Sequence, residues 1–148
     1  MENKNCKTLE MLKRCLDYYY GNILISDVSG KILYVNDTLV KSYGLTMEKA
    51  LSMSVYDLVT EGVLDRSAVI NVLETGEASL TKIGISSGAK IDCVAKPVYN
   101  DDGKMEYIIA FSYDESFMSD LQNELRIEKK KNEEIKDTLL FIQQANKK

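Results

Sequence analysis

The 148-residue sequence contains no histidine and no tryptophan, and its only proline is Pro97. Without histidine the chain has no imidazole to act as a general base and no histidine ligand for zinc or haem iron. Most hydrolase triads and the commonest metal sites are therefore excluded, as is a phosphoryl-accepting histidine within this chain. We predict no catalytic residues and no metal site, and interpret the chain as a binding or signalling module rather than an enzyme.

The sequence also lacks the features of secreted, membrane-spanning and nucleic-acid-binding proteins. Its formal net charge of −4 is unsuited to phosphate contacts. No apolar run approaches the ~20 residues that span a bilayer, and residues 1–20 are too polar for a signal peptide. Cys6, Cys15 and Cys93 do not form a disulfide framework. We expect a cytoplasmic protein with free thiols that binds neither nucleic acid nor membrane.

What the chain does contain is enough apolar sequence for one folded domain, at 45% hydrophobic and 28% charged residues. All eight glycines lie between Gly21 and Gly103, so the middle is rich in turns and the C-terminal part has no helix breaker. Apolar residues at helical spacing before Gly21 indicate an N-terminal helix. We predict three parts: an N-terminal amphipathic helix over 1–20, a core over 21–117 and a C-terminal helix over 118–148.

Alternating apolar residues and glycine-containing turns predict five strands within the core, over residues 22–27, 31–35, 78–86, 90–99 and 105–113. Helices are expected between the second and third strands, over residues 36–43, 47–51, 55–58 and 64–74, with Asn36 as the N-cap of the first. The last strand is apolar on both faces, which predicts a central position in the sheet.

The C-terminal helix carries a heptad pattern typical of a coiled coil. Its a and d positions alternate at three- and four-residue steps: Met118, Leu121, Leu125, Glu128, Asn132, Ile135, Leu139 and Ile142. An asparagine at an a position, here Asn132, favours two parallel strands. We predict a parallel homodimer. The alternative is an amphipathic helix that lies on its own domain. Because Lys147-Lys148 ends the chain without a stop signal, we expect the helix to continue into an output domain that is missing here.

Several segments resemble a PAS domain when their order is considered. The first are Asn22–Asp27, Gly30–Asn36 and Tyr43-Gly44-Leu45, and the later ones are Pro97-Val98, Asp102-Gly103 and Asp114-Glu115-Ser116. The resemblance covers residues 9–117 and the helix that follows. It implies an α+β fold in which a five-stranded antiparallel sheet has helices on one face, flanked by an N-terminal helix and a long C-terminal helix.

The resemblance also bears on cofactors. Flavin photoreceptors of the family need a Gly-x-Asn-Cys-Arg-Phe-Leu-Gln motif, and the corresponding region, residues 47–58, has no cysteine. Haem-binding members usually ligate iron through histidine, which this chain lacks. The cofactor therefore stays unknown, with covalent flavin photochemistry and histidine-ligated haem disfavoured.

The family layout suggests a ligand pocket between the sheet and the helices of residues 36–74. Its expected lining is Met53, Tyr56, Ile83, Ile85, Cys93, Ala95, Ile109 and Phe111. The alternative is that these side chains simply fill the core, and Cys93 in particular has the character of a small buried hydrophobe. Tyrosine hydroxyls, including that of Tyr43, are the polar groups available to a ligand, although packing is the better interpretation of these residues.

The expected function is that of a PAS sensory and dimerisation domain of a bacterial-type regulator. It would bind a small molecule or partner and relay the signal through its C-terminal helix. The C-terminal part most resembles PAS segments of sigma-54-dependent transcriptional regulators, with histidine kinases second. The alternative is a ligand-free PAS module that only dimerises.

Overall fold

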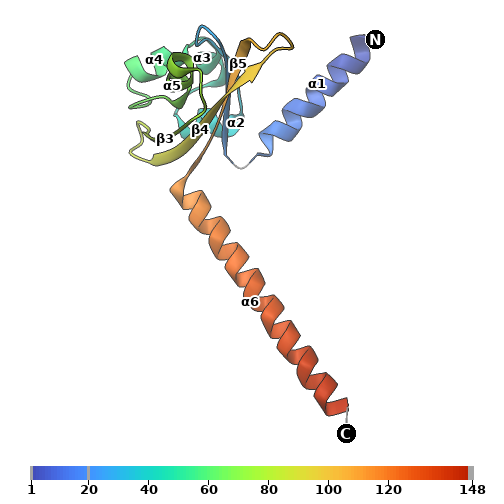
Figure 1. Ribbon diagram of the computed structural model, residues 1–148. Coiled ribbons are helices and arrows are strands. Elements are labelled where there is room, and N and C mark those ends of the chain that lie inside the picture. The colour runs from blue at the N-terminus through green and yellow to red at the C-terminus, as the bar shows by residue number, and fades with distance from the viewer. Residues whose placement is uncertain (1, 20, 147–148) are drawn as a thin grey trace. The chain divides into compact units, whose positions relative to one another are not determined.

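The structure is a computed structural model that describes residues 2–19 and 21–146, with the backbone alone for residues 2–3 and 114–118 (Figure 1). The chain divides into two compact units, Met1–Asp114 and Glu115–Lys148. The second contains one helix, α6 (Glu115–Asn146). The first contains α1 (Glu2–Asp17), β1 (Asn22–Asp27), β2 (Ile32–Val35), α2 (Asp37–Ser42), α3 (Met47–Leu51), α4 (Val55–Thr60), α5 (Ala68–Thr75), β3 (Ser79–Gly84), β4 (Lys90–Tyr99) and β5 (Met105–Asp114).

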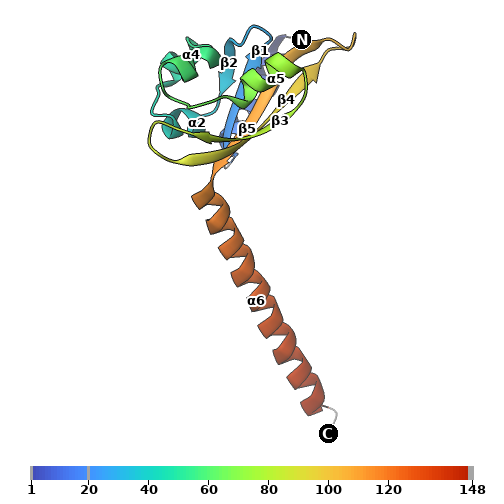
Figure 2. The same ribbon diagram turned by 60° about the vertical axis from the view of Figure 1, so that its left-hand side comes forward.

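The five strands form one antiparallel sheet in the order β2-β1-β5-β4-β3. This confirms the expected five-stranded antiparallel sheet and the central position of β5. Helices α2–α5 lie over one face of the sheet, as Figure 2 shows from the side. On the other face, Ile25, Ile109 and Phe111 are only partly buried, so β5 is well covered on one side alone.

Asn36, between β2 and α2, is completely buried and joins three segments through its side chain. Its Oδ1 accepts hydrogen bonds from the backbone N–H of Leu39, at 3.1 Å, and of Ile23 in β1, at 3.0 Å. Its Nδ2 donates to the carbonyl oxygen of Gly21, at 2.9 Å. The predicted N-cap of α2 is confirmed. The two further bonds fix the start of β1 against the end of β2.

Helix α5 begins later than the sequence predicted. The expected helix over 64–74 begins at Ala68, because Ser67 caps it by accepting a hydrogen bond from a backbone N–H in its first turn. Leu64, which belonged to the predicted helix, instead forms a β-bridge with Ile85. The apolar spacing was compatible with a helix, but the cap residue and the bridge determine where the helix starts.

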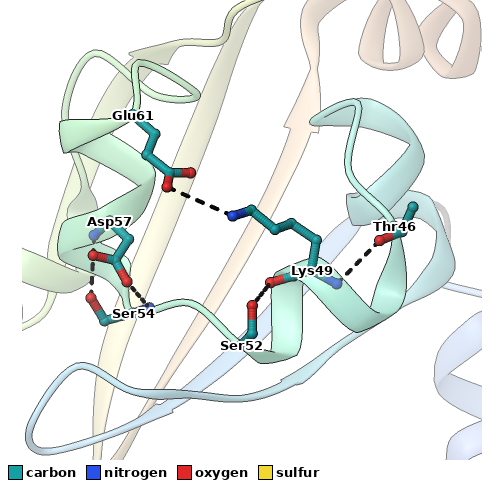
Figure 3. A network of polar contacts seen from close by, with 6 residues as sticks. All are labelled: Thr46, Lys49, Ser52, Ser54, Asp57 and Glu61. Atoms are coloured by element: carbon teal, nitrogen blue, oxygen red, sulfur yellow. Dashed lines mark hydrogen bonds and ion pairs between the residues drawn. The ribbon is translucent and has the colours of Figure 1, made fainter.

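Helices α3 and α4 are held by surface hydrogen bonds at their ends (Figure 3). Thr46 Oγ1 accepts from the N–H of Lys49, at 3.1 Å. Ser54 and Asp57 form a reciprocal capping box at the start of α4. The Nζ of Lys49 lies 3.7 Å from a carboxylate oxygen of Glu61, an exposed pair that contributes little stability by itself. The caps therefore set where the two helices begin, next to the sheet.

In the β1–β2 and β4–β5 turns, a side-chain oxygen accepts hydrogen bonds from backbone N–H groups of the turn. The residue is a charged Asp27 in the first turn and a neutral Asn100 in the second. Asp27 Oδ1 accepts from the Ser29 hydroxyl, at 2.6 Å, and from the N–H groups of Ser29 and Lys31. The hydrogen bond from the Ser29 hydroxyl is the main reason that the pKa of Asp27 lies below its ordinary value. In the β4–β5 turn, Asn100 Oδ1 accepts from two backbone N–H groups in the same way. Each turn thus satisfies its backbone donors locally.

We predict that Asn36→Ala lowers the free energy of unfolding by about 2–4 kcal/mol. The substitution removes the cap and leaves a buried carbonyl and a buried N–H without partners. Chemical denaturation of the unsubstituted protein and of the variant measures the difference in the free energy of unfolding. The matched control is Thr46→Ala, which removes an exposed N-cap alone and is expected to cost about 1 kcal/mol. Equal losses in the two variants would contradict the role given to Asn36.

Candidate functional site

A small cavity lies in the core between the sheet and helices α2, α4 and α5. The sheet contributes Leu24, Ile83, Cys93, Ala110 and Ser112 to its wall, and the helical side contributes Leu39, Tyr43, Val55, Leu58, Leu64, Ser67, Ala68 and Val69. Its volume is about 20 Å³, enough for a single water molecule. Pockets for drug-sized ligands enclose ~300–1,000 Å³. In the described conformation this space is too small for a cofactor or an ordinary metabolite.

Four buried side chains give the cavity wall its polar atoms: Tyr43, Ser67, Cys93 and Ser112. The Tyr43 hydroxyl and the Ser112 side chain share a hydrogen bond. Burial raises the pKa of Tyr43 far above its ordinary value, and it raises the pKa of the Cys93 thiol to about 12. Both groups are therefore neutral at physiological pH. They can form hydrogen bonds, but the thiol is not activated as a nucleophile.

Five of the eight predicted pocket residues lie in the core on the helix-covered side. Ile83 and Cys93 line the cavity. Met53, Ile85 and Ala95 are buried in the same apolar cluster but do not border the space. The structure thus brings these five together, and for three of them it shows core packing rather than contact with a cavity.

The other three predicted residues lie elsewhere, which corrects the predicted lining. Ala110 and Ser112 of β5 face the cavity, so the alternate residues Ile109 and Phe111 belong to the opposite face of the sheet. There the ring of Phe111 packs edge-on against Tyr19, with ring centroids 6.0 Å apart. Tyr56 is 45% exposed.

The position of Tyr56 has a local cause. Its ring carbons lie so near Gly30 that a Cβ atom there would be 2.7 Å away, and Gly30 has a φ of +90°. The β1–β2 turn therefore requires glycine for two reasons, its backbone conformation and its contact with an aromatic ring. Tyr56 covers this turn and does not border the cavity.

The sequence analysis did not identify Ser67 and Ser112 as cavity residues. It named Tyr43 only as one of the tyrosines whose hydroxyl could contact a ligand. One signal for Ser112 was available: if β5 pairs with β4 so that small residues face small residues, Ser112 opposes Cys93 and Ala110 opposes Ala95, as they do. No local signal identified Ser67, because its place depends on where α5 begins.

The heptad positions of α6 form the second candidate functional feature. The side chain of Met118 lies outside the described residues. The five other apolar members, Leu121, Leu125, Ile135, Leu139 and Ile142, are 38–61% exposed, and Glu128 and Asn132 are exposed too. A seam of this length with this much exposed apolar surface is typical of a helix that pairs with another helix.

The described residues contain neither a group of metal ligands nor a membrane-spanning helix. Within residues 2–19 and 21–146, no three His, Cys, Asp or Glu side chains are grouped as a metal site requires. In the same part of the chain, no helix combines the length and the apolar character needed to cross a membrane.

The sheet and the helices that enclose the cavity lie within a segment that matches a known protein family. The model of the PAS fold matches residues 13–114. The chain belongs to the PAS family. PAS domains are sensory domains of signalling proteins, so this chain is a sensor component of signal transduction. No curated protein matches the chain.

Solved PAS structures share the fold at low sequence identity. The PAS domain of Bordetella pertussis BvgS is 17% identical with a TM-score of 0.61, over 85% of this chain and 98% of that chain. The PAS domain of an HTR-like protein from Haloarcula marismortui is 18% identical with a TM-score of 0.58, over 76% and 96%. A sensory box sensor histidine kinase from Vibrio cholerae is 17% identical with a TM-score of 0.52, over 76% and 95%. These likenesses concern the fold.

We predict that Cys93 resists alkylation in the native protein. Its thiol is buried and its pKa is raised to about 12, whereas Cys6 and Cys15 are exposed. Iodoacetamide at neutral pH, followed by mass spectrometry, should modify two cysteines in the folded chain and all three in denaturant. Modification of Cys93 at the same rate as the exposed pair would contradict the closed core.

Proposed function

We propose that this PAS domain is the sensory and dimerisation domain of a cytoplasmic, bacterial-type signalling or transcription regulator. It binds a small molecule or a partner and passes the signal to a downstream output domain through α6. The carrying observation is the apolar heptad seam of α6, which a single chain leaves exposed. Paired as a parallel homodimer, two such helices bury the seam and connect two sensor cores to two output domains.

The connection between the cavity and α6 supports this path for the signal. Strand β5 ends at Asp114 and α6 begins at Glu115, with no residue between them. Ser112, which lines the cavity and bonds Tyr43, lies two positions before the end of that strand. A change in the contacts of the cavity wall therefore acts on β5, which continues directly into α6. Two alternative arrangements of the paired α6 helices then give a two-state output.

We place the change between the two arrangements of the helix pair at the weakest section of the seam. Glu128 and Asn132 are consecutive d and a positions, and both are polar, so this part of a helix pair gains the least from burial. Apolar residues flank it on both sides, with Leu125 before it and Ile135 after it. A shift in helix packing costs least at this point.

The resemblance favours a sigma-54-dependent transcriptional regulator as the full protein, with a histidine kinase as the alternative. Under either assignment the chain performs no chemistry. The output domain carries the activity, and the PAS core and α6 determine when that activity is available.

The second candidate function, a ligand-free dimerisation module, is favoured by one observation: the core cavity has a volume of only about 20 Å³. We predict that a sensor purified from its native cell carries an extractable small molecule, or shows a rise in melting temperature with at least one compound of a metabolite panel. Mass spectrometry of the organic extract and thermal shift measurements check this. An empty extract and no thermal shift would favour the ligand-free module.

We predict that Asn132→Leu strengthens the dimer by about tenfold, because it places an apolar residue at a seam position that the proposed pairing buries. Analytical ultracentrifugation measures the dissociation constant, and the melting temperature should rise with it. The matched control is Asn123→Leu, the same substitution on the outer side of the helix, which should leave the dimer unchanged. An unchanged oligomeric state and melting temperature in the Asn132 variant would contradict the seam.

A further inference from the structure

The segment that joins α1 to β1 lies against the last residues of β5. Gly21 is buried, and its carbonyl oxygen accepts a hydrogen bond from Asn36 Nδ2, at 2.9 Å. A Cβ atom on Gly21 would overlap the backbone carbonyl oxygen of Ser112 and would lie 3.0 Å from the ring of Tyr19. Gly21 does not have a positive φ, so glycine is needed here for close approach and not for its backbone conformation. The backbone that enters β1 is therefore packed directly on the backbone at the end of β5.

Tyr19 contacts the same end of β5 on the outer face of the sheet. Its ring packs edge-on against Phe111, with ring centroids 6.0 Å apart. Burial is the main cause that raises the pKa of Tyr19, and the nearby Tyr113 raises it further. Phe111 and Tyr113 precede and follow Ser112, whose side chain lines the cavity on the inner face. Tyr19 and the cavity therefore lie on opposite faces of one short stretch of β5.

Tyr19 is also bonded to the last turn of α1. The N–H of Tyr19 donates to the carbonyl oxygen of Leu16, at 3.1 Å. The N–H of Tyr18 donates to the carbonyl oxygen of Cys15, at 3.2 Å. Residues 4–15 are all exposed, so little of α1 outside its C-terminal turn is covered by the core. A change in the direction of α1 therefore reaches the core at the C-terminal end of this helix.

We infer that α1 is a second input of this domain, coupled through Tyr19 and Gly21 to the end of β5 and so to the start of α6. When α1 changes direction, Tyr19 displaces Phe111, and Gly21 cannot move toward Ser112 without displacing that backbone. Because α6 follows β5 with no residue between them, the displacement reaches the first turn of α6 without passing through the cavity. This input adds to the proposed function and rests on it only for the last step, the pairing of α6.

Amide hydrogen exchange of the 148-residue chain tests the coupling. Lys13→Pro interrupts α1 before its last turn, and Lys13→Ala removes the same side chain while keeping the helix. Lys13→Pro should raise the exchange rates of amides 111–122, at the end of β5 and in the first turns of α6, about threefold to tenfold, the scale of one aromatic contact. Lys13→Ala should leave these rates unchanged. Unchanged rates in the Lys13→Pro variant would overturn the coupling.

The amides of β3 provide the internal control for this measurement. Strand β3 lies at the edge of the sheet, separated from β5 by β4, so its exchange reports a general loss of stability and not a change at the end of β5. The β3 rates should stay unchanged in both Lys13 variants. An equal rise in β3 and in amides 111–122 would overturn the coupling.

Two tyrosine variants test whether Tyr19 is the point of contact. Tyr19→Ala removes the packing against Phe111, whereas Tyr18→Ala removes a neighbouring ring that is 84% exposed. In the Tyr19→Ala background, Lys13→Pro should raise exchange little further, because the contact through which it acts is already absent. In the Tyr18→Ala background, its full effect should persist. The same increment in both backgrounds would overturn the role of Tyr19.

Two glycine variants test the backbone contact. The methyl group of Gly21→Ala meets the carbonyl oxygen of Ser112 and should raise the exchange rates of amides 111–122 at least as much as Lys13→Pro does. The matched control is Gly84→Ala, whose Cβ would meet only the side chain of Asp65, at 3.0 Å, and which should leave these amides unchanged. Equal rates in the two variants would overturn the role of Gly21.

The dissociation constant of the dimer tests the proposed function separately. Analytical ultracentrifugation of the Lys13→Pro variant should show a changed dissociation constant, because the start of α6 is altered. Raised exchange in amides 111–122 together with an unchanged dissociation constant would support the coupling of α1 to β5 and contradict the relay of the signal through pairing of α6.

Discussion

The side chain of Asn36 is the interaction on which the arrangement of the sensor core depends. One buried amide caps α2, accepts a hydrogen bond from the N–H of Ile23 in β1 and donates one to the carbonyl oxygen of Gly21. Because β1 pairs with both β2 and β5, this single residue relates the first helix over the sheet to the central strand. The N-cap side chains of α3, α4 and α5 bond only within the first turn of their own helix, so they set where helices begin but do not connect distant segments.

A closed core follows from this arrangement and constrains how such a domain senses. Next to the cavity, the inner face of β5 and β4 carries four small residues, Ala110, Ser112, Cys93 and Ala95, and Tyr43 follows the end of α2 on the opposite wall. The remaining space takes one water molecule and presents neutral hydroxyls and a neutral thiol. A ligand of ordinary size therefore has to displace side chains of α2 or α5 to enter. Such a displacement would change the contacts of the inner face of β5, the strand that continues directly into α6.

Local patterns in the sequence were sufficient for most of the fold but not for the site. Alternation gave the strands, and the position of Asn36 gave a helix start, because both signals act within a few residues. Strand β5 is apolar on both faces, so its pattern contains no information on which face turns inward. The smaller residues face the helices, and Ile109 and Phe111 face the other way. The cavity serines, the bonds from Asn36 to β1 and the close approach of Gly21 to β5 all depend on contacts between distant segments, which one sequence does not reveal.

The proposed function depends on α6 pairing in parallel with a second copy of the chain. The most direct measurement is a set of spin-label distances in the intact chain, with Cys6 and Cys15 replaced by serine and single labels at position 123 or 144, which lie on the outer side of the predicted seam. A parallel pair gives a short distance between the labels of the two copies at both positions. An antiparallel pair would separate at least one label pair by much of the helix, and a monomer would give no dipolar signal. Either result would contradict parallel pairing of α6.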